Sequence, residues 1–350
     1  MQPDLQWRQL RQAGLLAHLP NAWRMPLARL ALAWLGIFAL TAREWGQMAH
    51  QWWDIDTYNH ILLVPLLVIW LISLRVKGLR QLNPQHWTPG LGLVLAGLTL
   101  WLIGRASGIN LIAQAGAVGA LQASLIAFLG LRVVTYLLLP AAMLTFLVPF
   151  GDEIIPFLQS ITAEIAIKLT MWSGVEAVYE DIYIHTPVGL FIVAEECSGV
   201  KFLIAMVTLG VLVAFTSFAT WKRRMAFMAA CLIVPIIANG IRAWGTIFIA
   251  QSKGVEFAAG FDHIVYGWVF FAIVMAIVIG GALPFFDREP ENAGYSAAEV
   301  KTMGWLDTLS ALQNFAKGKL NASGNQTLLI ALALMLGFAL AAIYASAPIG

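Results

Sequence analysis

Long runs of apolar residues, separated by short polar segments, occupy most of this chain. A helix needs ~20 residues, at a rise of ~1.5 Å each, to cross ~30 Å of hydrocarbon. Most of the apolar runs are about that long, so the pattern predicts eight or nine membrane-spanning helices. The predicted spans are 27–43, 61–76, 90–107, 110–130, 133–149, 199–219, 226–249, 264–285 and 327–346.

The pattern changes between residues 150 and 196, where we expect a small insertion outside the membrane. Residues 156–172 have the pattern of an amphipathic helix that lies on the membrane surface, with Glu164 and Lys168 one turn apart. A small hairpin should follow, because β-rich runs flank the turn-forming segment Thr186-Pro187-Val188-Gly189. These two runs are 178–185 and 190–194.

Composition supports an integral membrane protein. Sixty per cent of the residues are hydrophobic and 11% are charged, and the 14 tryptophans suit an interfacial aromatic belt. The net charge of +2 comes with no basic patch for nucleic acid. The predicted fold class is therefore all-α, a polytopic bundle of about eight or nine transmembrane helices with a helix and hairpin insertion. The predicted divisions are a membrane domain 1–285 with core 30–285 and insertion 150–196, a cytoplasmic polar linker 286–326, and a final helix within 327–350.

The lysines and arginines predict the orientation. With the N-terminus in the cytoplasm, fifteen of the 21 basic residues fall on cytoplasmic segments, as the positive-inside rule requires. The clearest marker is the compact basic turn Trp221-Lys222-Arg223-Arg224 between two spans. This orientation places residues 150–196 on the extracytoplasmic side.

Three reactive side chains fall at one depth in these spans. Cys197 precedes an inward span and therefore lies at the outer surface. Arg242 is 16 residues after Ala226 on the next, outward span, or ~24 Å along it. His263 opens the following inward span. All three should lie within about one helical turn of the outer interface.

A thiol, an imidazole and a guanidinium at one depth are the parts of a cysteine peptidase or transpeptidase. The guanidinium, the imidazolium and a helix N-terminus all favour the thiolate of Cys197. His263 can pass a proton to a leaving amine, and Arg242 can stabilise an oxyanion or position the substrate. Each residue also has a structural interpretation: a packed cysteine, an arginine that snorkels to the interface, and an interfacial histidine.

The residues around Cys197 suggest a supporting role. Ser198, expected at the surface, and Gly199 should form the tight turn into the helix, where Gly199 lets a substrate backbone approach closely. Glu195 and Glu196 can tune the site, repel wrong segments, or simply be solvated.

Cys231 is expected to be a small core residue without a disulfide, because it falls near the opposite membrane face from Cys197. We find no metal-ligand spacing such as His-Glu-x-x-His, and predict neither metal nor cofactor.

The motifs Glu195-Glu196-Cys197-Ser198-Gly199-Val200 and Asn239-Gly240-Ile241-Arg242, with His263 at a span start, resemble the signatures of the exosortase/archaeosortase family. Tyr58-Asn59-His60, followed by Pro65, resembles another signature, with Ile61 where the family pattern has glycine. The similarity covers roughly residues 30–285, and the nearest type is the bacterial exosortase A group.

The resemblance implies a membrane cysteine peptidase or transpeptidase of the bacterial inner membrane. Its substrates would be exported proteins with a C-terminal Pro-Glu-Pro signal, an apolar helix and a basic tail. Cys197 would be the nucleophile, Arg242 the transition-state or substrate-positioning residue, and His263 the general acid and base. The supporting residues would be His60, Tyr58, Glu196, Ser198, Gly199 and Asn239.

The resemblance also implies a link to exopolysaccharide and biofilm assembly, and the absence or removal of the extracytoplasmic domain that follows the last span in some members.

Other functions stay open from the residues alone. The main alternative is a non-enzymatic component of a polysaccharide assembly or export complex, with Arg242 as a substrate contact. A transporter is disfavoured because intramembrane charge is sparse and no matching pair of broken helices is visible. A serine intramembrane protease would need a serine buried in a span opposite a histidine, whereas Ser198 is expected at the surface.

Overall fold

The computed structural model describes residues 20–256, 267–320 and 323–345. Within these residues, eight helices are long and apolar enough to span a membrane, or nine if a bent helix pair counts as one span. The same residues contain a three-stranded sheet. The predicted fold class, a polytopic helical membrane protein with a small β insertion, is therefore confirmed. The chain divides into two compact units, unit 1 (Met1–Pro149 and Pro290–Gly350) and unit 2 (Phe150–Glu289).

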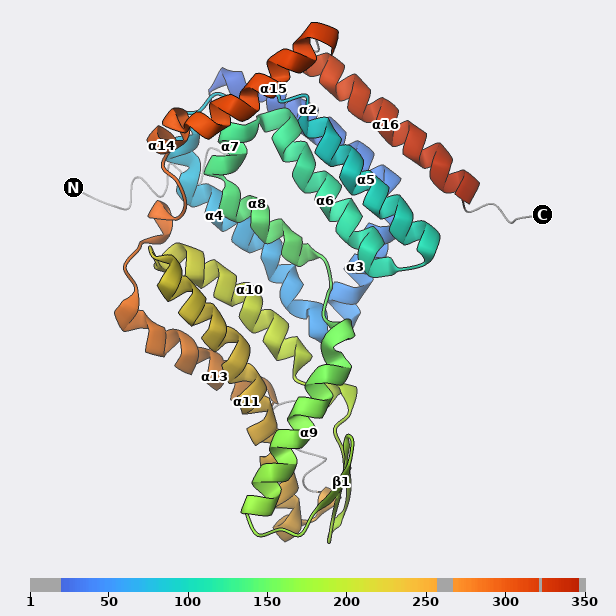
Figure 1. Ribbon diagram of the computed structural model, residues 1–350, viewed down its shortest axis with the longest axis vertical. Coiled ribbons are helices and arrows are strands. Elements are labelled where there is room, and N and C mark those ends of the chain that lie inside the picture. Colours follow the sequence, from blue (N-terminus) through green and yellow to red (C-terminus); the bar gives the residue numbers. More distant parts are fainter. Residues whose placement is uncertain (1–19, 257–266, 321–322, 346–350) are drawn as a thin grey trace. The chain divides into compact units, whose positions relative to one another are not determined.

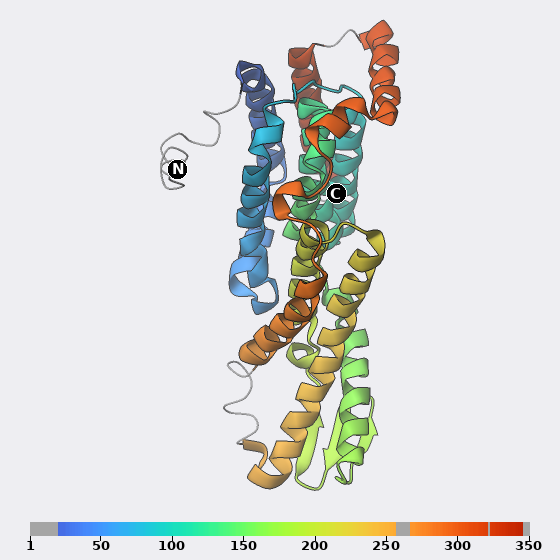
Figure 2. The same cartoon turned by 90° about the vertical axis from the view of Figure 1, so that its left-hand side faces the viewer.

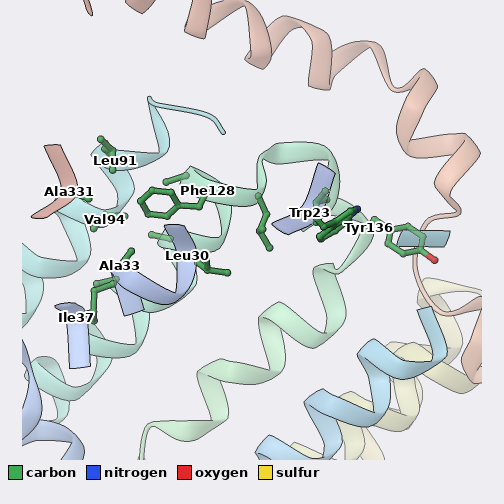
Figure 3. Packing of buried hydrophobic residues seen from close by; sticks show 14 of the residues in the cluster. Trp23, Leu30, Ala33, Ile37, Leu91, Val94, Phe128, Tyr136 and Ala331 are labelled. Atoms are coloured by element: carbon green, nitrogen blue, oxygen red, sulfur yellow. The ribbon is translucent and has the colours of Figure 1, made fainter. Parts of the chain in front are cut away.

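Unit 1 is a helical bundle. Helices α2, α5, α6 and α16 pack side by side (Figure 1), and their facing apolar side chains form its core (Figure 3). Trp23 joins this core through its ring and donates its indole N–H to the carbonyl of Leu82. The helices of unit 1 are α2 (Arg24–Leu40), α3 (Ala42–Asp54), α4 (Val64–Leu79), α5 (Gly90–Ser107), α6 (Asn110–Leu129), α7 (Leu131–Tyr136), α8 (Leu138–Met143), α14 (Ala297–Thr302), α15 (Gly304–Leu320) and α16 (Gly324–Ala345).

Helices α5 and α6 approach closely because small residues repeat every seven positions on both. A Cβ added to any of three glycines of α5 would lie within 3 Å of the backbone of a facing alanine of α6. Such small-residue contacts let helix backbones pack tightly where lipid offers no hydrophobic driving force. The facing pairs are Gly90 with Ala127, Gly97 with Ala120, and Gly104 with Ala113.

The predicted span 133–149 is wrong as a continuous helix. The structure has two six-residue helices, α7 and α8, followed by a short 3₁₀ turn, Leu144–Leu147. Pro140 explains the break, because it has no N–H to donate to the carbonyl of Tyr136 and its ring would clash with that carbonyl. The helix restarts at Leu138, which places Pro140 in a first turn, where proline is tolerated.

Unit 2 combines four helices of the described chain with the sheet. These elements are α9 (Ile155–Trp172), β1 (Val178–Glu180), β2 (Tyr183–Thr186), β3 (Gly189–Ile192), α10 (Val200–Ser217), α11 (Trp221–Lys253) and α13 (Gly267–Ala282).

The predicted hairpin is present as β2 and β3, which pair in antiparallel register. The run 178–185, predicted as one strand, instead forms two strands. The chain turns between them at Asp181, whose φ is +55°. The third strand, β1, pairs antiparallel with β2, so the strand order is β1-β2-β3.

Helix α11 organises unit 2. Its 33 residues make a helix ~50 Å long, well beyond the ~30 Å of a hydrocarbon core. Its first part lies along α10, where Gly210 faces Cys231, and its last part lies along α9 and the sheet (Figures 1 and 2). One helix therefore connects the α10 and α13 layer to the α9 and sheet layer.

Helix α9 occupies the segment where a surface helix was predicted. The expected pair forms, with Lys168 Nζ 2.5 Å from Glu164 Oε1. By length and composition α9 also qualifies as a membrane span, so its position on the membrane surface stays a prediction.

The glycine packing between α5 and α6 can be tested with a matched pair of substitutions. A Cβ at Gly116 would lie 2.2 Å from the backbone nitrogen of Trp101, whereas a Cβ at Gly119 meets nothing within 4 Å. Gly116→Ala should destabilise the protein by about 1–3 kcal/mol, because the two backbones must separate. Gly119→Ala should leave stability unchanged or raise it, since alanine is the better helix former. Thermal melting in detergent checks this, and equal melting temperatures for the two variants would contradict it.

Candidate active site

Cys197 lies on a compact turn that joins the sheet to α10. After β3 ends at Ile192, the chain forms one 3₁₀ turn, Glu195–Cys197, and α10 begins at Val200. The N–H of Cys197 donates to the carbonyl of Ala194 over 2.9 Å. The cysteine side chain is half-buried and packs at the edge of the apolar cluster formed by α9, α11 and the sheet. The thiol is therefore held beside the N-terminus of a long helix.

Gly199 makes the turn into α10 possible. Its φ is +81°, the left-handed region where glycine has no steric penalty. A Cβ on Gly199 would lie 2.7 Å from Cγ of Asn239, so the glycine also allows close packing against α11. The approach of a substrate backbone to Gly199 stays a prediction.

The Asn239 side chain fixes this turn to two helices. It is 1% exposed, and its Nδ2 donates to the carbonyl of Cys197 over 2.8 Å and to Oγ1 of Thr162 over 3.0 Å. Asn239 is on α11 and Thr162 is on α9. One buried amide therefore sets the height and direction of the backbone that carries the thiol.

Arg242 is one turn beyond Asn239 on the same face of α11. Its guanidinium hydrogen-bonds the Cys197 side chain, and its positive charge acts on the thiol. The structure thus brings Cys197 and Arg242 together, as the count of residues along the spans indicated. A fixed cation beside a sulfur favours the thiolate, the form that attacks carbonyl carbon. Here the charge of Arg242 opposes the burial of the thiol, which disfavours the charged form and is the larger effect.

An aromatic pair extends the site toward α13. The rings of Phe202 and Phe271 stack with centroids 3.6 Å apart and 10° between their planes. The Arg242 Cζ is 6.0 Å from the Phe271 centroid, and Lys201 Nζ is 5.1 Å from the Phe202 centroid. Sequence reasoning had not singled out Lys201, Phe271 or Thr162. Lys201 had one visible signal, since it is a cation on the predicted extracytoplasmic side.

The other residues of the motif have different environments. Ser198 is only 2% exposed, so the prediction that it lies at the surface is wrong. Its Oγ turns back toward the N–H of Val200, 3.4 Å away, which places it inside the turn. Glu195 and Glu196 are exposed, and the Glu196 carboxylate is close enough to act on the thiol.

The structure does not place the three remaining predicted site residues beside Cys197. His263 lies outside the residues that the structure describes. Tyr58 and His60 belong to unit 1, in a 3₁₀ segment, Asp56–Leu63, that leads into α4. There Tyr58 is 2% exposed, and the Nδ1 of His60 is 3.1 Å from the carbonyl of Thr57.

The second cysteine is a core residue, as predicted. Cys231 is fully buried on α11 against Gly210 of α10, and both cysteines are free thiols.

Unit 1 has a polar cavity of about 980 Å³ between residues 81–87, residues 129–132 and α15. Its lining includes His86 and an ion pair between Arg132 and Asp307, 2.5 Å apart. None of the predicted site residues is among those found to line it.

The difference in burial between the two cysteines predicts selective chemistry. In native membranes, a membrane-permeant maleimide should modify Cys197 and leave Cys231 unmodified, because only Cys197 is partly exposed. Cys197→Ala should therefore abolish labelling until the protein is denatured, and Cys231→Ala should retain it. Mass-shift electrophoresis of the three proteins measures this. Labelling of native Cys197→Ala would contradict the described packing.

The role of Asn239 in holding the turn is tested by Asn239→Asp. An aspartate loses both donated hydrogen bonds and places an oxygen against the Cys197 carbonyl, so stability should fall by about 2–4 kcal/mol. Asn110→Asp is the matched control, because Asn110 is exposed at the first position of α6, where a negative charge is favourable. Melting temperatures in detergent distinguish the two variants. An unchanged melting temperature for Asn239→Asp would refute the role of Asn239 in holding the turn.

Residues 52–280 of the chain match the transmembrane exosortase family (Exosortase_EpsH). The matched stretch spans well over half of the 350 residues and contains Tyr58, Cys197, Arg242 and His263. Searches of curated proteins and of solved structures found no match to this chain. On the extent of the family match, the chain belongs to the transmembrane exosortase family.

Proposed function

We propose that this protein is a membrane-embedded cysteine peptidase or transpeptidase of the exosortase A group. Membership of the exosortase family implies a protease or transpeptidase. Its substrates are exported proteins that end in a Pro-Glu-Pro signal, an apolar helix and a basic tail. Because that helix is itself a membrane span, the substrate can diffuse laterally and present the outer end of its helix to the site.

The observation that carries this proposal is the hydrogen bond between Arg242 and the Cys197 side chain at the N-terminus of α10. Packing of a cysteine gains nothing from a cation, whereas a cation beside a nucleophilic cysteine favours its thiolate. The macrodipole of α10 adds partial positive charge at the same place. A guanidinium at a membrane boundary is also expected to face a partner or a cavity.

The chemistry follows from these roles. The sulfur of Cys197 attacks the carbonyl carbon of the scissile peptide, and its proton passes to His263. Arg242 donates hydrogen bonds to the oxyanion of the tetrahedral intermediate. His263 returns the proton to the leaving amine as the C–N bond breaks, which leaves a thioester on Cys197. Water or an amine then attacks the thioester and frees the thiol.

We place this site on the extracytoplasmic side of the bacterial cytoplasmic membrane. Lys222, Arg223 and Arg224 cluster where α10 ends and α11 begins, at the opposite end of α10 from Cys197. Arg223 is held there by Asp287, with 2.7 Å between Nη1 and Oδ2. The positive-inside rule assigns this basic end to the cytoplasm, and Cys197 then faces outward.

A processing assay in cells tests the proposal. A secreted reporter that ends in Pro-Glu-Pro, an apolar helix and arginines is co-expressed with each variant, and cleavage is followed by immunoblot. Cys197→Ala and His263→Ala should each abolish cleavage, because one removes the nucleophile and the other the proton carrier. Arg242→Ala should reduce cleavage at least ~100-fold, the loss seen when an oxyanion donor is removed.

Cys231→Ala is the matched control and should cleave normally, because Cys231 is buried away from the site. All variants must be present in the membrane fraction at equal levels. Cleavage that survives Cys197→Ala would overturn the thiol mechanism and favour a non-enzymatic role in polysaccharide assembly.

A further inference from the structure

We propose that Lys201 is a specificity-determining residue that binds the acidic side chain of the sorting signal. This inference rests on the proposed function and identifies the group that reads the substrate next to the scissile bond. Lys201 is four residues after Cys197 and is the second residue of α10.

The position of Lys201 opposes two local preferences. A helix N-terminus carries partial positive charge, so a cation there is electrostatically unfavourable. With the proposed orientation, Lys201 also lies on the extracytoplasmic side, where basic residues are disfavoured. Residues that break local rules are commonly found at functional sites.

Aromatic contacts tie Lys201 to the reactive centre. Its Nζ lies over Phe202, which stacks on Phe271, and Arg242 lies over Phe271. Lys201 and Arg242 therefore flank one stacked pair of rings, and Arg242 in turn contacts the thiol. Apolar rings exclude water, which strengthens the attraction between either cation and a carboxylate.

The two cations are suited to different tasks. Arg242 contacts the thiol and is placed to act on the scissile carbonyl, while Lys201 contacts the other ring of the stacked pair. The Glu196 carboxylate also acts on the thiol, so an acidic substrate residue at this site requires a compensating cation. An extended peptide advances ~3.3 Å per residue, so a residue a few positions from the scissile bond can reach Lys201. The glutamate of Pro-Glu-Pro has this chemistry.

A charge swap tests the assignment. Two reporters differ only in the signal, Pro-Glu-Pro or Pro-Lys-Pro, and are cleaved by wild type, Lys201→Glu, Lys201→Gln and Lys201→Arg. Wild type should prefer the glutamate reporter, and Lys201→Arg should keep that preference. Lys201→Gln should lower the preference about tenfold, the loss of one charge-assisted hydrogen bond. Lys201→Glu should reverse it and gain cleavage of the lysine reporter.

Lys253→Glu is the matched control, since Lys253 is at the far end of α11, and it should retain the wild-type preference. An unchanged ratio of the two reporters in Lys201→Gln overturns the assignment and leaves Lys201 as a snorkelling residue. If Lys201→Glu cleaves neither reporter, the ratio of the two reporters in Lys201→Gln still tests the assignment. No cleavage of either reporter by wild type would overturn the proposed function itself, and this assignment with it.

Discussion

The candidate site depends on one buried amide. Asn239 donates from Nδ2 both to the carbonyl of Cys197 and to Thr162, and these two bonds join α11, α9 and the turn before α10. The first N–H groups of a helix have no partner within that helix, so side chains of neighbouring elements help to fix the turn that precedes it. Gly199 allows the approach, because only a residue without Cβ fits against Asn239 at that φ. Since Arg242 is one turn along the same helix, the bond that positions the cysteine backbone also sets its distance from the guanidinium.

Helix α11 is long enough to contact α10 along its first part and α9 along its last part. Gly210 faces Cys231 and Gly199 faces Asn239, so α10 runs beside α11 up to Asn239. Helix α9 contacts α11 from Asn239 onward, through Ile165 with Gly240 and through Ser173 with Trp244. If α10 spans the membrane, α9 then lies mostly beyond the N-terminal end of α10. The buried face of α9 is covered by the sheet and α11. Composition alone counts α9 as a span, but this register favours a helix outside the hydrocarbon.

The features that depend only on regular helix geometry could be predicted from the sequence. Spans of ~20 apolar residues and a rise of ~1.5 Å per residue were sufficient to place Cys197 and Arg242 at one level, because both rules hold in any helix. Prediction failed at Ser198, where neighbours decide, because the turn closes around that side chain. The break at Pro140 was a local signal in the sequence, and the length of the mostly apolar run concealed it. The Asn239 bonds were out of reach, because they join residues 42 and 77 positions apart. His263 stays a prediction.

The positive charges at this site favour one orientation of the proposed substrate. Arg242 cannot be neutralised, and Lys201 contacts the same stacked pair of rings, so two cations lie against one buried aromatic pair. Two such cations stabilise an oxyanion, a thiolate and an acidic side chain, and they repel a basic one. A sorting signal has an acidic end and a basic end on either side of its apolar helix. The same electrostatics that favour the reaction therefore favour presentation of the acidic end, so catalysis and substrate polarity follow from one arrangement of charges.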